Sequence, residues 1–144
     1  MIKLGDYRSF LEKIGESENL TLLAITIDKE MSRRLQQLQR GARVLFWLPP
    51  AAKSAGVSDF WKDANSCVLF VMEKYDPQRE ESIDVLERLQ PAAEAVKKSI
   101  MELDYMGCSG VHPDLSSFDM MPETEFYGSL AGWSIGFKLI TEDS

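Results

Sequence analysis

The sequence contains few of the residues that enzymes and metal proteins use for chemistry. It has one histidine, His112, and two cysteines, Cys67 and Cys108, in 144 residues. A single histidine excludes a metal site built from several histidines of one chain. Two thiols do not make the disulfide framework of a small secreted protein, so we expect both cysteines to be reduced.

Phosphate-binding and nucleophile motifs are missing as well. There is neither GxGxxG nor GxxxxGK followed by Ser or Thr, and YGSLAG lacks the GxSxG spacing of a nucleophile elbow. Cys108, His112 and Asp114 remain as candidates for a nucleophilic set, but they belong to one loop-like segment, which holds side chains poorly. Zinc would also need Cys67, which lies in an apolar run expected to be a buried strand. We therefore expect no catalytic residues, no cofactor and no metal ion.

A basic surplus and a long apolar run are also absent. The 23 acidic residues outnumber the 16 basic ones, and the formal net charge of -7 disfavours a broad contact with nucleic acid. No apolar run approaches the roughly 20 residues that span a bilayer. The first residues, MIKLGDYRSFLEK, become charged too soon for a signal peptide. We expect a cytoplasmic protein with neither nucleic acid nor a membrane as its partner.

What is present is the composition of a globular protein. Apolar residues make up 44% of the chain and charged residues 27%, and no run of Gly, Ser or Pro is long enough to form a linker. A length of 144 residues matches one ordinary domain. We expect a single domain, residues 1–144.

Strands are predicted where apolar and β-branched residues cluster. The segments 20–27, 42–48 and 66–75 have this composition, and Pro49 and Pro50 stop the second. Segment 66–75 is a nearly continuous apolar run, which places it in the middle of the sheet.

A further strand is predicted at 133–140, after a short one within 124–132. Its apolar residues fall on every second position, so they share one face of a strand: Trp133, Ile135, Phe137 and Leu139. That face is either the inside of the domain or a surface for another subunit. Gly136 would let a neighbouring group approach closely.

Helices are predicted from apolar spacings of three and four. This spacing occurs at 6–16, at 28–40 and over a longer stretch that starts at Asp76–Pro77 and ends by Gly107. The apolar stripe of the longest helix consists of Leu86, Leu89, Ala93, Val96, Ile100 and Leu103. Pro91 interrupts this stripe, and we expect it to kink the helix or to divide it in two.

The segments 49–64 and 108–122 have the composition of connections. The order of the elements predicts an α+β fold, with a single mixed β-sheet packed with one long helix and shorter helices.

Five aromatic residues lie near predicted turns or on alternate faces, and they have two alternative roles. They either complete the core or form a subunit contact, since aromatic residues are enriched at interfaces. The possible interface consists of Trp47, Phe60, Trp61, Tyr127 and Trp133.

Three segments, VLFWLPP, CVLFVMEKYDP and YGSLAGWSIGFKL, resemble small proteins encoded in prophage-type structural clusters of bacterial genomes. More remotely, the element order over residues 20–140 is similar to that of tail-terminator and head-tail completion proteins of tailed phages. The resemblance implies a non-enzymatic protein that forms a ring with copies of itself and sits on a tail tube or connector. Its partners would be its own copies or other virion-type structural proteins, and the protein would be virion-associated.

Two other functions remain open from the sequence. One is a binding module for a peptide or small ligand, with the segments 49–64 and 108–122 as walls and a pocket near Phe60, Trp61 and Met120. The other, which the sequence favours least, is an enzyme that uses Cys108 as its nucleophile.

Overall fold

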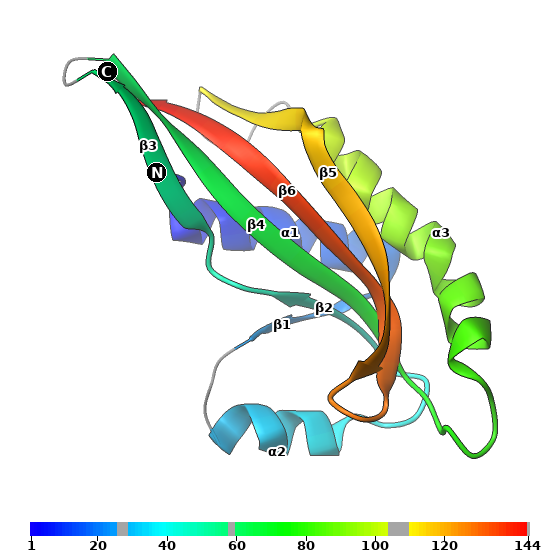
Figure 1. Cartoon of the computed structure of the whole chain (residues 1–144). Coiled ribbons are helices and arrows are strands. Elements are labelled where there is room, and N and C mark those ends of the chain that lie inside the picture. Colours follow the sequence, from blue (N-terminus) through cyan, green and yellow to red (C-terminus); the bar gives the residue numbers. More distant parts are fainter. Residues whose placement is uncertain (26–28, 58–59, 104–109, 144) are drawn as a thin grey trace.

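The structure is a computed structural model that describes residues 1–25, 29–57, 60–103 and 110–143. Within these residues, six strands form one mixed sheet and three helices accompany it (Figure 1), which confirms the predicted α+β fold. The helices are α1 (Leu4–Glu18), α2 (Lys29–Gln37) and α3 (Ser82–Met101). The strands are β1 (Thr21–Ala24), β2 (Arg43–Trp47), β3 (Ala51–Val57), β4 (Phe60–Lys74), β5 (Val111–Phe126) and β6 (Leu130–Asp143).

Strand β4 lies at the centre of the sheet, as predicted from its apolar run. The strand order is β1-β2-β4-β6-β5, and β3 pairs with β4 as well. Strands β2 and β3 pair with successive parts of the same edge of β4, because Trp47 lies opposite Leu69 and Ala51 lies opposite Ser66. Only the β1–β2 pair is parallel among the pairs of the described strands.

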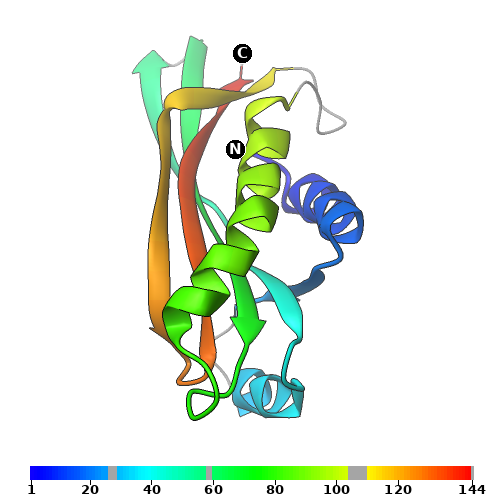
Figure 2. The ribbon, with the colours of Figure 1, turned by 90° about the vertical axis from the view of Figure 1, so that its right-hand side faces the viewer.

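One face of the sheet packs on α1 and α3, which lie on the same side of it (Figure 2). Alternate residues of β4 and β6 point to these helices: Cys67, Leu69, Val71, Ile135, Phe137 and Leu139. They pack with the apolar stripe predicted within residues 86–103, all of whose members are buried. The alternating face of β6 is therefore the inside of the domain, with Trp133 half-buried at its end.

The second face of the sheet is covered by α2 at one end only. Met31 and Leu35 of α2 pack on a cluster formed by Val44, Phe46, Met72 and Leu130. These strand residues alternate with those that face α1 and α3, so α2 lies on the opposite side. Further along the same face, Val68 and Met121 are 38% and 55% exposed.

Both segments predicted as connections contain strands instead. Residues 51–57 form β3 and residues 60–64 begin β4, while β5 runs through most of 108–122. The small and polar residues of β3 have low β-propensity, so their extended form comes from pairing with β4. Pro113 and Pro122 are tolerated because β5 is an edge strand.

Helix α3 begins later than predicted. Asp76 makes a turn, in which its carboxylate accepts a hydrogen bond from the backbone N–H of Gln78 at 3.0 Å. The helix starts instead after Glu81, whose backbone N–H donates to the Asp84 carboxylate at 3.2 Å. Pro91 lies inside α3, so the chain forms one helical element here and not two. The predicted stop at Gly107 lies outside the described residues.

Close approach of two strands explains one glycine of β6. A Cβ atom on Gly132 would lie 1.9 Å from the backbone oxygen of Val71 on β4. Gly136 also has a close neighbour, as predicted, because its Cβ position is 2.7 Å from a carboxylate oxygen of Asp119. No described helix is both long and apolar enough to cross a bilayer.

Candidate functional site

One end of the sheet extends past α1 as a projection (Figure 1). We call this part the arm and define it as β3, residues 60–66 of β4 and residues 138–143 of β6. All seven residues of β3 are exposed. In the described part of the chain β3 pairs with β4 alone, so its other edge carries backbone groups without a strand partner.

A fully buried amide fastens the arm to the rest of the molecule. The Nδ2 atom of Asn65 donates to the backbone oxygen of Leu139 at 2.8 Å and to the hydroxyl of Thr141 at 3.2 Å. Its Oδ1 atom accepts from the backbone N–H of Ile2 at 3.1 Å. This one side chain therefore links β4, β6 and the segment before α1.

Asp63 makes a second buried polar contact in the arm. One oxygen of its carboxylate accepts from the Ser54 hydroxyl at 2.5 Å, and the other pairs with the amino group of Met1. The hydrogen bonds from the amino group and from Ser54 lower the pKa of Asp63. Because both oxygens are occupied, this carboxylate acts as a structural anion and is not free to serve as a base.

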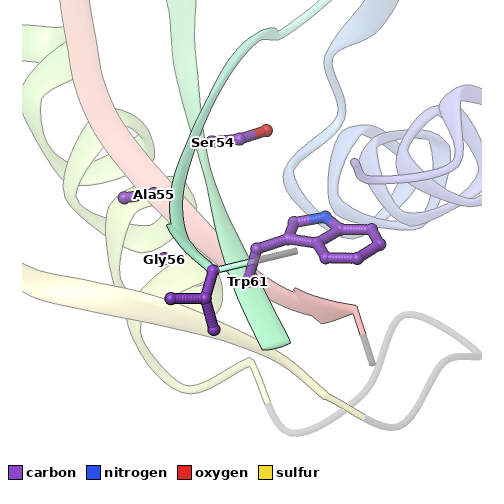
Figure 3. Close-up of a pocket in the computed structure, with 5 residues that line it drawn as sticks. Ser54, Ala55, Gly56 and Trp61 are labelled. Atoms are coloured by element: carbon purple, nitrogen blue, oxygen red, sulfur yellow. The ribbon is translucent and has the colours of Figure 1, made fainter. Parts of the chain in front are cut away.

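A shallow hollow lies on the arm beside these groups (Figure 3). Residues 54–57 of β3 and Trp61 of β4 line its volume of about 340 Å³. Trp61 is half-buried, whereas Val57 is 69% exposed. The hollow therefore joins an indole ring to the free edge of β3, an arrangement suited to an apolar side chain of an added strand.

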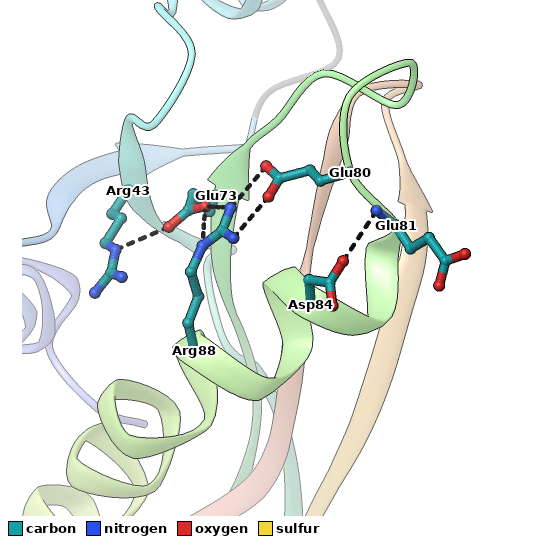
Figure 4. A network of polar contacts seen from close by, with 6 residues as sticks. All are labelled: Arg43, Glu73, Glu80, Glu81, Asp84 and Arg88. Carbon is teal, nitrogen blue, oxygen red and sulfur yellow. Dashed lines mark hydrogen bonds and ion pairs between the residues drawn. The ribbon is translucent and has the colours of Figure 1, made fainter.

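An ionic network lies at the opposite end of β4 (Figure 4). Glu73 is 3% exposed, and its carboxylate accepts from Arg43 Nε at 3.0 Å and from Arg88 Nε at 2.7 Å. Arg88 also donates through both Nη atoms to Glu80 at 2.8 Å, which lowers the pKa of Glu80. The network fastens β2, β4 and α3 together, and its charges are satisfied within it. It is hard to predict from the sequence, because Glu73 ends an apolar run.

Tyr7 and Cys67 form a buried pair between α1 and the sheet. Burial raises the pKa of the Tyr7 hydroxyl, and burial also raises the pKa of the Cys67 thiol to about 11. The thiol donates to the backbone oxygen of Asn65 at 3.5 Å. A thiol with so high a pKa is mostly protonated at neutral pH and is a poor nucleophile.

The five aromatic residues predicted as a possible interface have different positions. Trp47 is 5% exposed and packs edge-on against Tyr7, with ring centres 5.9 Å apart, so it belongs to the core. Trp133 is half-buried, and its Nε1 donates to the backbone oxygen of Leu86 at 3.0 Å. Trp61 lies on the arm, and Tyr127 is 52% exposed at the β5–β6 turn. The side chain of Phe60 lies outside the described residues.

The candidate chemical residues are dispersed or outside the described part of the chain. Cys108 lies outside it. His112 is exposed on β5, and the Asp114 carboxylate accepts from the Ser116 hydroxyl at 2.7 Å. Among the residues that the structure describes, no three His, Cys, Asp or Glu side chains gather as a metal ion would require.

The pocket predicted for a binding module has different walls. The hollow at Trp61 is lined by the β3–β4 pair, whereas Met120 packs against the main core from β5. The arm, with its free strand edge and its hollow, is therefore the feature that carries a functional argument. No protein-family model matches the chain, and no curated protein matches it.

Proposed function

We propose that the protein is a non-enzymatic assembly subunit that acts by associating with copies of itself. The observation that carries this proposal is the arm, in which a seven-residue strand is exposed along its whole length at the edge of the sheet. An exposed strand edge offers a row of backbone donors and acceptors to another chain. The core does not need this edge, because α1, α3 and the other strands already enclose it.

The uncovered part of the sheet supports the same proposal. Val68 of β4 and Met121 of β5 are exposed apolar side chains on the face that α2 leaves open, and Val57 is exposed on the arm. Val57, at the free edge of β3, is available for contact with another protein surface.

The resemblance to tail-terminator and head-tail completion proteins gives the proposal its specific form. In that form the subunits make a ring on a tail tube or connector, and the further partners are other virion-type structural proteins. The alternation of β6 contributes to the core, so the contact surface would lie on the arm and the open face and not at Trp133.

The proposal is tested by measuring the mass in solution. Light scattering over about two orders of magnitude in protein concentration should show a mass that rises above that of one chain, because association follows mass action. Chemical crosslinking at each concentration should trap the same species. A single-chain mass throughout, together with no crosslinked species, would contradict self-association.

The hollow at Trp61 favours one alternative, a module that binds an extended peptide. Such a module would be stabilised against thermal unfolding by short apolar peptides, and Trp61 fluorescence would change on binding. A Trp61→Ala variant should lose both responses if the hollow is the site.

A further inference from the structure

The edges of the sheet differ in how they are protected against pairing with another chain. Strand β5 carries two prolines, and its pairing with β6 is interrupted by register shifts at two places. It also carries the carboxylates Asp114, Asp119, Glu123 and Glu125. Prolines, bulges and charges are the usual devices that stop strand addition at an edge. Strand β1 has only four residues.

Strand β3 has almost none of these devices. Its sequence AAKSAGV contains no proline and one charged residue, Lys53, and its pairing with β4 runs without a register shift from Ala51 to Val57. All of its residues except Lys53 and Val57 are small. An edge of this length and composition is open to an added strand.

We propose that β3 pairs with β3 of a second copy, antiparallel and about a two-fold axis, so that two sheets join edge to edge. This inference rests on the proposed self-association and names the surface that performs it. A two-fold contact uses the same patch on both copies, so one unprotected edge is sufficient.

Charge and side-chain size together favour one register of this pairing. With Lys53 opposite its own copy, two like charges would face each other, which destabilises a strand pair. With Ser54 opposite its own copy, Lys53 faces Ala55 of the second copy and Ala51 faces Val57. Every large side chain then lies opposite a small one, so the two strands fit without a clash.

In the same register, equivalent faces of the two copies lie on the same side of the joined sheet. Lys53 and Ala55 share the face of Ala64 and Lys62, because directly paired residues lie on one side of a sheet. The joined sheet would therefore carry α1 and α3 of both copies on one side. The opposite side, which α2 covers only in part, would become one continuous surface.

The contact is small for a stable dimer. Seven residues from each copy fall short of the roughly 20–30 residues a side of a standard interface. The second copy's Ala52 would lie opposite Gly56 and beside the hollow at Trp61, which adds a limited apolar contact. We therefore expect a reversible dimer whose population depends on concentration.

A set of charge variants at Lys53 and Ala55 tests the pairing. Ala55→Lys would place a new positive charge against Lys53 of the second copy at two symmetric positions and should weaken the dimer about two- to thirtyfold. Ala55→Glu should leave it as tight or tighten it. The double variant Lys53→Glu with Ala55→Lys should restore the dimer, since opposite charges again face each other.

Thr124→Lys on β5 is the matched control, because Thr124 is also exposed on an edge strand. It should leave the dissociation constant unchanged. Since Ala55 lies opposite Lys62 within one chain, the thermal unfolding of each variant is compared at a dilution where it is monomeric. This comparison separates a damaged arm from a lost contact.

Each result decides between distinct conclusions. Weakening by Ala55→Lys with rescue by the double variant supports the two-fold β3 pairing. An oligomer that Ala55→Lys leaves unchanged, or that the double variant fails to rescue, overturns this pairing and leaves the proposed self-association in place. A single-chain mass of the unaltered protein at every concentration overturns both.

Discussion

The two halves of β4 lie in different surroundings although they form one continuous strand. Residues 67–73, the closed half, lie near β2 and β6, with α1 and α3 over one face and α2 reaching the other. Residues 60–66 belong to the arm, where β3 replaces β2 as the neighbour opposite β6 and all seven residues of β3 are exposed. Leu69, Val71 and Met72 are fully buried, whereas Lys62 and Ser66 are exposed.

Different forces therefore hold the two halves in place. Apolar burial dominates in the closed half, and the Glu73 network fastens its end. In the arm, Asp63 and Asn65 are the buried residues of β4 among those whose side chains the structure describes, and hydrogen bonds hold both. In the arm, buried hydrogen bonds hold β4, while the other edge of its neighbour β3 is exposed. That exposed edge is suited to contact with another subunit.

The largest effect is expected from removing an apolar side chain in the closed half. Leu69→Ala should lower the free energy of unfolding by about 2–5 kcal/mol, because it leaves a cavity among fully buried side chains. The adjacent Val68→Ala, at a position 38% exposed, should cost less than about 1 kcal/mol. Urea unfolding at a concentration where the protein is monomeric measures both. Equal losses at the two positions would contradict the assignment of the two faces.

The closed half can largely be predicted from the sequence. Its strands are apolar runs and its helices carry regular stripes, so burial of Leu89 or Val96 follows from spacing alone. The predicted start of α3 is wrong because Asp76–Pro77 has the composition of a helix start, while the backbone forms a separate turn there.

The arm cannot be predicted in this way. Strand β3 has the composition of a loop, and only its pairing with β4, a long-range contact, gives it an extended form. The fastening by Asn65 is equally unpredictable, because nothing in the residues near position 65 indicates Leu139 or Thr141 as partners. Trp61 is unusual in the sequence, but its place beside β3 depends on the same pairing.

The next largest effect is expected in the arm. Asn65→Ala should cost about 2–3 kcal/mol, because it leaves the Ile2 N–H and the Leu139 carbonyl buried without their partner. The exposed neighbour Ser66→Ala should change stability by less than about 0.5 kcal/mol.

Hydrogen exchange measures which part of the protein loses stability in Asn65→Ala. In Asn65→Ala the amides of residues 51–66 and 138–143 should exchange faster, while those of 67–73 change little. Uniform acceleration along the whole of β4 would mean that the two halves unfold as one unit and would remove the distinction between them.

A smaller loss is expected when the ionic network at the closed end is opened. Arg88→Met should cost about 1–2 kcal/mol, because Glu73 remains buried and keeps Arg43 as its partner. Arg8→Met, which removes an exposed pair with Glu12, should cost less than about 0.5 kcal/mol.

The pH dependence of stability provides a second readout for Arg88. Its hydrogen bonds lower the pKa of Glu80, so this carboxylate stabilises the fold above its ordinary pKa and loses that contribution as the pH falls. The free energy of unfolding of Arg88→Met should therefore decrease less on acidification than that of the unaltered protein. In the variant the free energy of unfolding should still decrease as the pH falls, because the pKa of Asp63 is also lowered. An unchanged acid profile would mean that Glu80 gains nothing from Arg88 in solution.

The smallest effect, and the only expected increase in stability, concerns the Tyr7 hydroxyl, which lies against the closed half. The Tyr7 hydroxyl is buried and makes no hydrogen bond of normal geometry among the described residues, although the Cys67 sulfur, a weak acceptor, lies near it. Burying such a group without a partner costs free energy, so Tyr7→Phe should raise the free energy of unfolding by up to about 1 kcal/mol. The ring would keep its edge-on contact with Trp47, and Tyr7→Leu, which removes that contact, serves as the control and should destabilise. Urea unfolding of the three proteins measures the difference. A clear loss in Tyr7→Phe would mean that the hydroxyl is satisfied in solution, and the closed half would then depend on a polar contact as the arm does.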